Sequence, residues 1–145
     1  MVSKDIPDYA VNEANRTKTE LIAMEEVMKT ERMLEREPKD VHEHNFGWDI
    51  ESVDQKTKDI FFIEVKGRVK GADIITVSSN EIKTGKNVSQ DNPLRYILAV
   101  VEVEDDKPLP ARYVRSPFEK IEIDFSTTSI NFDTKKLLAK SEVPR

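Results

Sequence analysis

The sequence predicts a single α/β (α+β) domain in which a mixed sheet is flanked by helices. Three observations predict this class: a long Gly- and Pro-free segment typical of a helix, several short β-branched and aromatic runs typical of strands, and a second helical segment between the third and fourth of these runs. Such mixing favours a sheet packed against helices. The 145 residues suit one domain, 1–145, with a core over about 12–118 and a peripheral tail over 119–145.

The first expected element is a helix over residues 12–35, which lacks Gly and Pro and is rich in Ala, Glu, Lys, Leu and Met. Residues at helical spacing form one stripe that should pack on the sheet. Glu31 falls on this stripe, so an inward acid is expected there, held by a salt bridge, a hydrogen bond or a place in a polar site. The other glutamates of the helix, Glu20 included, fall mostly off the stripe and are expected to be solvated. The stripe consists of Met24, Val27, Met28, Glu31 and Leu34.

Three strands are expected after a polar loop that begins at Pro38. Residues 46–53 alternate apolar and polar side chains, and residues 60–66 are β-branched or aromatic at almost every position, so the two should form a hairpin. Residues 74–77 form a third, shorter run. Trp48, within the first of these strands, is expected in the core against the long helix.

A helix and further strands complete the predicted order. Polar residues that suit an N-cap precede a helix that starts near Glu81 and that Gly85 is expected to keep short. Residues 95–103 are nearly all apolar, as in a strand covered on both faces, and residues 111–115 should form an edge strand. The tail over 118–138 is expected to hold one more strand and a terminal helical turn.

Composition excludes several classes of protein. The chain lacks cysteine, which rules out disulfides and Cys-based zinc sites and suits a reducing, cytoplasmic setting. It has no apolar signal at its start and no apolar run near the roughly 18 residues of a membrane span, so no membrane partner is expected. With 23 Lys and Arg against 28 Asp and Glu, the net charge is −5, and contact with a polyanion therefore requires a local basic patch.

The candidate site is built around Glu64 and Lys66, which interrupt the most apolar of the early strands. Strand alternation places both side chains on one face, and Asp49 of the neighbouring strand can face the same way. Isolated buried charges are costly, so this end of the strand must open into a cleft or carry partners. Other acid-x-Lys triplets lie in loops, turns or at a helix start, where their charges are solvated. They begin at Glu37, Asp54, Glu81, Asp105 and Asp133.

Two carboxylates and an ammonium in one patch suit phosphodiester hydrolysis. Neighbouring carboxylates repel unless a cation lies between them, and Mg²⁺ is held by one or two carboxylates, waters and substrate phosphate oxygens. Mg²⁺ (or Mn²⁺) on Asp49 and Glu64 would activate a water, and Lys66 would orient it or neutralise charge at phosphorus. Glu31 is the further catalytic candidate, because it is an inward acid. A structural Glu–Lys ion pair at a strand end is the alternative.

Together these residues resemble the PD-(D/E)XK nuclease superfamily, which has the restriction-endonuclease-like fold with an αβββαβ core. The resemblance assigns the motif's Asp, Glu and Lys to Asp49, Glu64 and Lys66 and its first-helix acid to Glu31, while Trp48 stands where the motif has Pro. More closely, the chain is similar to the NO VEIN C-terminal domain family, whose members are often appended to helicase-like and restriction-type proteins. The similar stretches are 31–32, 47–50, 62–68, 79–81, 96–98 and 116–118.

The resemblance implies a metal-dependent nuclease domain acting on DNA, as a module of a helicase- or restriction-type system. A helicase-like domain in the same or an associated chain and a homodimer are the further expected partners. The alternative is a catalytically silent accessory module of the same fold that binds DNA or a partner. His42 and His44 are expected to be loop histidines rather than a general base. Residues 64–86 hold five bases against three acids, and the candidate phosphate contacts among them are Arg68, Lys70, Lys83 and Lys86.

Overall fold

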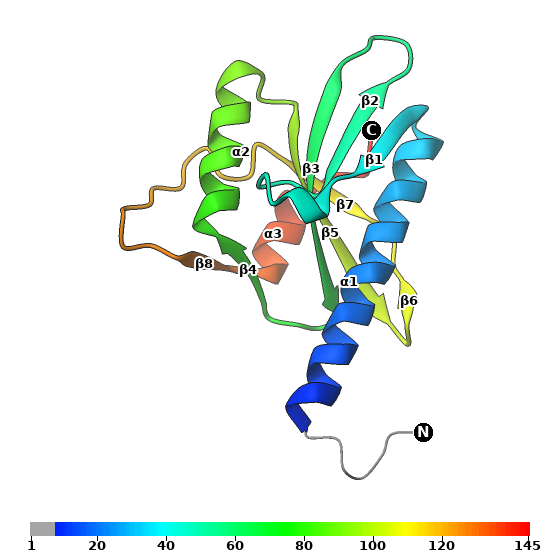
Figure 1. The fold of residues 1–145 in the computed structure, drawn as a ribbon, viewed down its shortest axis with the longest axis vertical. Coiled ribbons are helices and arrows are strands. Elements are labelled where there is room, and N and C mark those ends of the chain that lie inside the picture. The colour runs from blue at the N-terminus through cyan, green and yellow to red at the C-terminus, as the bar shows by residue number, and fades with distance from the viewer. Residues whose placement is uncertain (1–7) are drawn as a thin grey trace.

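A computed structural model describes residues 8–145 of the protein, with side chains from Thr17 onward. It shows a curled mixed sheet with α1 on one face and α2 and α3 on the other (Figure 1). This arrangement confirms the predicted class. The elements are α1 (Asp8–Met33), β1 (Arg36–Asp40), the 3₁₀ turn η1 (His42–His44), β2 (Ile50–Asp54), β3 (Ile60–Val69), β4 (Ile74–Ser78), α2 (Ser79–Asp91), β5 (Tyr96–Glu104), β6 (Lys107–Pro108), β7 (Arg112–Arg115), β8 (Ser129–Asp133) and α3 (Thr134–Lys140).

The main sheet combines an antiparallel meander with one parallel pair. β1, β2 and β3 pair antiparallel in turn, and β3 then pairs with β5 in parallel. The chain between these two strands passes through β4 and α2, since parallel neighbours need a crossover connection. β6 and β7 both pair with β5, whereas β4 leaves this sheet and pairs with β8 in a separate two-stranded sheet.

β1 is a strand that the sequence analysis did not predict. Residues 36–40 read Arg-Glu-Pro-Lys-Asp and were expected to be a loop. The strand lies at the edge of the sheet, where a proline such as Pro38 is tolerated because one side of the strand needs no ladder hydrogen bonds. The expected strand over 46–53 begins only at Ile50. The expected third strand, 74–77, forms as β4 but lies outside the main sheet, so β1 to β3 are the three strands that follow α1 there.

α2 runs for 13 residues and passes through Gly85, so the expectation of a short helix was wrong. Gly85 is buried, and a Cβ there would lie 2.7 Å from ring atoms of both Tyr96 and Phe118. Glycine therefore allows a close packing that offsets its cost of about 1 kcal/mol in a helix. At the helix start Ser78 and Glu81 form a capping box, in which each side chain accepts the backbone N–H of the other residue.

Two hydrophobic cores lie on opposite faces of the sheet. Val27 of α1 packs with Ile63 in one, and Ile82 of α2 and Leu137 of α3 belong to the other. The tail thus contributes to the second core, and β8 and α3 match the strand and helical turn expected over 118–138. None of the helices in the described part of the chain is long and apolar enough to cross a membrane.

Candidate active site at the free edge of β3

The candidate site lies where β3 extends beyond its partner β2. The ladder between these strands ends at Ile50 opposite Ile63, whereas β3 continues to Val69, paired among the described residues with β5 alone. Asp49 occupies this transition, because its N–H donates to the Ile63 carbonyl and its Oδ2 accepts the Val65 N–H at 2.8 Å. The Asp49 carboxylate is thereby held at the free edge of β3.

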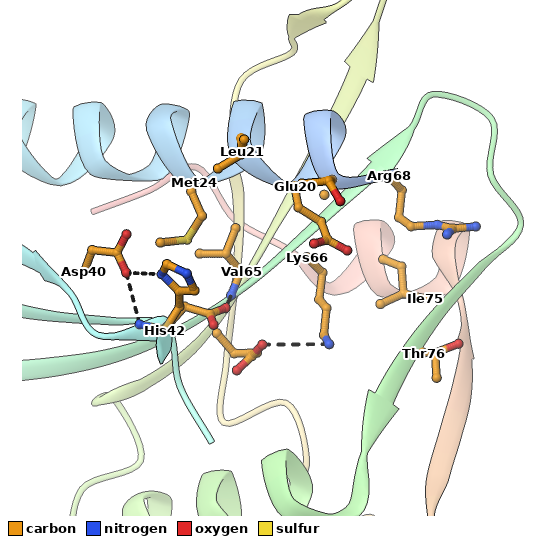
Figure 2. Close-up of a pocket in the computed structure, with 14 residues that line it drawn as sticks. Glu20, Leu21, Met24, Asp40, His42, Val65, Lys66, Arg68, Ile75 and Thr76 are labelled. Carbon is orange, nitrogen blue, oxygen red and sulfur yellow. Dashed lines mark hydrogen bonds and ion pairs between the residues drawn. The ribbon is translucent and has the colours of Figure 1, made fainter. Parts of the chain in front are cut away.

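α1 approaches β3 closely at Gly67. A Cβ at this position would lie 2.6 Å from Ala23 Cβ and 3.0 Å from the Thr19 carbonyl oxygen, so the contact requires glycine. The approach brings the first half of α1 over the free edge, and Glu20 projects from it into the space beside β3 (Figure 2). Glu20 was expected to be solvated. It is exposed, yet it stands one turn before Met24 and so extends the apolar stripe, which is the signal that could have identified it.

A cavity of about 540 Å³ lies beside this edge. Acidic and basic side chains line it from four segments: Glu20 from α1, Asp40 and His42 from the end of β1 and from η1, Asp49 from just before β2, and Glu64, Lys66 and Arg68 from β3. Strand alternation explains why the three β3 side chains share one face. The structure therefore brings Asp49, Glu64 and Lys66 together, and it adds Glu20 to them.

Glu64 is almost completely buried, at 4% exposed. Burial raises the pKa of its carboxyl well above the ordinary value, the charges of Asp49 and Glu81 raise it further, and Lys66 opposes them. A hydrogen bond between the Glu64 and Asp49 carboxyls adds to the rise in pKa. Two carboxyl groups that share a site ionise together only at a cost, so Glu64 keeps a proton at pH values where an exposed glutamate has lost it.

Lys66 donates a hydrogen bond from Nζ to Glu81 Oε1 at 3.0 Å, and Glu64 Oε1 lies 3.8 Å from the same nitrogen. Burial lowers the pKa of Lys66, but the charges of Glu64 and Glu81 outweigh burial, and the net pKa is raised. Lys66 is therefore an ammonium at neutral pH and not a general base. The sequence analysis missed Glu81 as a member of the site, because Ser78-x-x-Glu81 indicates a capping box and nothing more.

Glu31 lies outside the cavity, which corrects its predicted place in the site. It is fully buried, as its position on the stripe predicted, but it pairs with Arg36 at 3.1 Å and accepts a hydrogen bond from the Tyr113 hydroxyl at 2.7 Å. Along α1 it is eleven residues from Glu20, about 16 Å at the helical rise of 1.5 Å per residue. The prediction failed because Arg36 comes from β1, the strand that was not expected.

Of the four bases of the predicted phosphate-contact patch, one lines the cavity. Arg68 lines the cavity. Lys70, which directly follows β3, forms an ion pair with Glu104 at 3.3 Å. The Lys86 ammonium donates a hydrogen bond to the backbone carbonyl of Ile121. Lys83 is exposed on α2. Of the four, Arg68 alone borders the acidic residues of the cavity.

His42 also lines the cavity, at the end of β1, so it is closer to the site than a plain loop histidine. Its side chain is hydrogen-bonded to Asp40, as Figure 2 shows, and this bond raises the pKa of His42, with smaller contributions from the charges of Glu43 and Asp49. His44 instead stacks on Phe46.

The carboxyl groups of Asp49 and Glu64 are the candidate ligands for a divalent metal ion. They fit in charge, because the mutual repulsion that raises the pKa of Glu64 is the repulsion that a bound cation would offset. Mg²⁺ is commonly held by one or two carboxylates and several waters. Among the described side chains, no group of three or more His, Cys, Asp or Glu is arranged to hold a metal ion, so the fit is to a sparse oxygen site of this kind.

Comparison with known proteins identifies the family and the fold. The family described as "Protein NO VEIN, C-terminal" matches residues 19–114, more than half of the chain. No curated protein sequence matches this chain. Among solved structures the chain is similar to Hjc, a Holliday junction resolvase from Archaeoglobus fulgidus, with a TM-score of 0.54 and 10% sequence identity over 86% of this chain and 90% of that chain. This likeness shows the restriction-endonuclease-like fold and nothing finer. The chain belongs to the NO VEIN C-terminal family.

Proposed function

We propose that the domain hydrolyses phosphodiester bonds of DNA with a divalent metal ion, Mg²⁺ or Mn²⁺. The observation that carries this proposal is the convergence of Asp49, Glu64 and Lys66 in an open cavity at the free edge of β3, on a restriction-endonuclease-like fold. An ion pair that served the fold alone needs neither a cavity nor a second carboxyl whose charge raises the pKa of the first.

Asp49 and Glu64 would hold the metal ion. When bound, it supplies a water of lowered pKa and stabilises charge at phosphorus. Asp49 is already fixed by the Val65 N–H and Glu64 by its burial in β3, so neither carboxyl has to be ordered on binding. Glu64 would give up its proton as the metal binds, because the ligand must be a carboxylate.

Lys66 would contact the scissile phosphate as a cation. Its raised pKa keeps it protonated, and Glu64 and Glu81 fix the direction of Nζ. An ammonium held in place stabilises the negative charge that develops on the phosphate oxygens. Arg68, two residues on and on the same face, is the candidate contact for a neighbouring phosphate.

Glu20 would take the place in the site that the sequence analysis gave to Glu31. It projects from α1 into the cavity, whereas Glu31 is engaged by Arg36 and Tyr113. Its carboxylate adds an acceptor on the α1 side of the cavity, where it can orient a water.

Cleavage of supercoiled plasmid DNA in Mg²⁺ or Mn²⁺ tests this proposal. Asp49→Asn, Glu64→Gln and Lys66→Ala are each expected to lower the cleavage rate by about 100-fold or more. Glu25→Gln, which changes an exposed acid of α1 that does not line the cavity, should keep the wild-type rate. Equal rates in the wild type and the three site variants would contradict the proposal, because the cleavage would then come from another source.

A catalytically silent module of the same fold, which binds DNA or a protein partner, is the second candidate. It is favoured by the hydrogen bond between Lys66 and Glu81, since an ammonium that already has a close carboxylate partner is less available to a phosphate. The plasmid assay separates the two candidates: the silent module would retain DNA binding and give no metal-dependent cleavage in any variant.

The partners and location of the chain are part of the same proposal. With a net charge of −5, the isolated domain is expected to bind DNA weakly and in a salt-dependent way, so a helicase-like partner in the same or an associated chain would deliver the substrate in the cytoplasm. A homodimer would place one cavity at each of the two strands of a DNA duplex. Light scattering at several concentrations and copurification with tagged protein test these partners.

A further inference from the structure

A series of aromatic rings runs from the surface of the protein toward the candidate active site. His44 and Phe46 stack with ring centroids 5.1 Å apart and 11° between their planes. Phe46 lies 5.5 Å from Trp48, and Trp48 lies 4.7 Å from Phe62. We name these four residues the aromatic ladder. Its outer rings are exposed, with Phe46 at 45%, while Trp48 and Phe62 pack on the second core. Trp48 was expected against the long helix, and it lies on the opposite face of the sheet.

The inner end of the aromatic ladder adjoins the candidate catalytic residues. Phe62 and Glu64 are two residues apart on the same face of β3, about 7 Å along the strand. Trp48 directly precedes Asp49 in the chain. Phe62 and Trp48 are therefore close in the chain to Glu64 and Asp49, although the rings themselves do not line the cavity.

The loop that carries the outer rings is held in place by α2 and β5, and in Figure 1 it extends from η1 toward α2. The Phe46 carbonyl accepts a hydrogen bond from the Thr84 hydroxyl at 3.3 Å, and the Gly47 carbonyl accepts one from the Tyr96 hydroxyl at 2.9 Å. Gly47 has a φ of 97°, and a Cβ there would lie 2.5 Å from Thr84 Oγ1, so the loop depends on glycine at this point. Because the backbone that carries Phe46 is held in this way, its ring loses little conformational freedom when a ligand binds.

We propose that the aromatic ladder binds an unpaired nucleobase, which stacks on the exposed pair His44 and Phe46 while its strand runs on toward Asp49 and Glu64. Every base has a π-face, so stacking of this kind is independent of sequence, and a base that is paired within a duplex is not free to make it. Lys83, an exposed base that precedes Thr84 on α2, is the candidate cation for a phosphate of the same strand. This inference rests on the proposed function and narrows its substrate to nucleic acid with single-stranded or branched segments.

Binding without divalent metal tests the inference apart from cleavage. Trp48 is the only tryptophan of the chain, so its fluorescence reports a ligand at the aromatic ladder. In EDTA and low salt, the full chain is titrated with oligothymidylate and oligouridylate of about twelve nucleotides, within the usual site sizes, and with a duplex of the same length. The single strands are expected to quench Trp48 and to bind more tightly than the duplex. The thymidylate and uridylate arms tell whether DNA or RNA supplies the base.

Variants of Phe46 decide whether stacking carries the binding. Phe46→Ala and Phe46→Leu should weaken single-strand binding by about ten-fold or more, and Phe46→Tyr, which keeps a ring, should retain it. Phe125→Ala is the matched control, because Phe125 is fully exposed elsewhere on the chain. Circular dichroism of each variant checks that the fold is kept.

Two results would overturn the inference. One is equal single-strand affinity in the wild type and Phe46→Leu, and the other is failure of the wild type to prefer single strands over duplex. Since no metal is present, a protein that passes this test but cleaves neither plasmid nor single-stranded DNA in Mg²⁺ or Mn²⁺ would refute the proposed hydrolysis and leave the stacking site standing.

Discussion

The ammonium of Lys66 is hydrogen-bonded at 3.0 Å to Glu81, whose carboxylate also accepts the Ser78 N–H at the start of α2. One carboxylate therefore anchors a helix terminus and the cation of the candidate site. Burial raises the pKa of Glu81, but Lys66 and the Ser78 N–H more than offset it, and the net pKa is lowered. The start of α2 and the direction of Lys66 are thus coupled through a single side chain.

Glu81→Gln tests this coupling. The amide can still accept the Ser78 N–H, but the charge beside Lys66 is lost, so we expect the free energy of unfolding to fall by about 1–2 kcal/mol. The pKa of Glu64 should fall as well, because the charge of Glu81 is one of the groups that raise it. Urea denaturation and NMR titration of the glutamate carboxyls measure the two effects. Glu119→Gln, at an exposed acid, is the control; an unchanged Glu64 titration in Glu81→Gln would refute the coupling.

The raised pKa of Glu64 predicts how stability depends on pH. The folded protein binds a proton at Glu64 more tightly than the unfolded chain does, so the stability that this proton contributes is complete below the ordinary pKa of 4.5 and is lost as the pH rises through the higher folded pKa. Glu64→Gln imitates the protonated carboxyl at every pH. At pH 8 it should therefore unfold with a free energy about 0.5–2 kcal/mol greater than the wild type, and at pH 4 the difference should vanish.

Urea denaturation of the wild type and Glu64→Gln at the two pH values measures this effect. A loss of several kcal/mol in Glu64→Gln at pH 8 would mean instead that the Glu64 carboxylate is a needed partner of Lys66, as in a structural ion pair.

Metal binding is expected to release about one proton, because Glu64 must become a carboxylate to act as a ligand. The affinity for Mg²⁺ or Mn²⁺ should accordingly rise with pH until the folded pKa of Glu64 is passed. Calorimetric titrations in two buffers with different ionisation enthalpies count the proton directly. Asp49→Asn should bind the ion much more weakly. At a pH below the folded pKa of Glu64, a binding heat that is the same in both buffers would exclude Glu64 as a ligand.

Glu20 and Glu31, two of the acids of α1, are expected to respond differently to replacement by glutamine. Glu31→Gln leaves the buried guanidinium of Arg36 without a charged partner, so the protein should lose about 3–5 kcal/mol of stability. Glu20→Gln should cost less stability than Glu31→Gln and should lower metal-dependent cleavage, because Glu20 is exposed and lines the cavity.

Thermal unfolding and plasmid cleavage, measured side by side, separate the two acids, and Tyr113→Phe provides a milder change in the Glu31 cluster, costing about 1 kcal/mol. A stable, fully folded Glu31→Gln protein without activity would restore Glu31 to the site and remove Glu20 from it.

The sequence was sufficient to predict strands where the pattern of apolar residues determines the structure. β5 was predicted to within one residue at each end because it is a buried strand with a continuous apolar run. β3 was predicted from its first residue, but it runs on to Val69 rather than ending at Lys66. β1 was missed because an edge strand of five mostly polar residues has no hydrophobic signal, and Pro38 argued for a loop. The pairing of β4 with β8 was also unpredictable, since Thr76 meets Asn131 across a long separation in sequence.

The error over Glu31 follows from the error over β1. The stripe on α1 correctly predicted that Glu31 points inward, but the choice between a site and a salt bridge depended on knowing where Arg36 lies. Without β1 no cation partner for Glu31 was visible, and the resemblance to the PD-(D/E)XK superfamily assigned it to the site. Glu20 extends the apolar stripe, but its position beside β3 depends on the close contact between α1 and Gly67, which is a feature of tertiary packing.

The early end of the β2–β3 ladder has a consequence for how this domain can diverge. The cavity lies where β3 is longer than β2. Its location therefore depends on the lengths and register of these strands more than on the side chains around it. A slip of β2 by one residue would turn the Asp49 side chain to the opposite face, whereas replacing most of the lining leaves the opening in place. Insertions or deletions within β2 and β3 are therefore expected to alter the cavity more than substitutions of its lining residues.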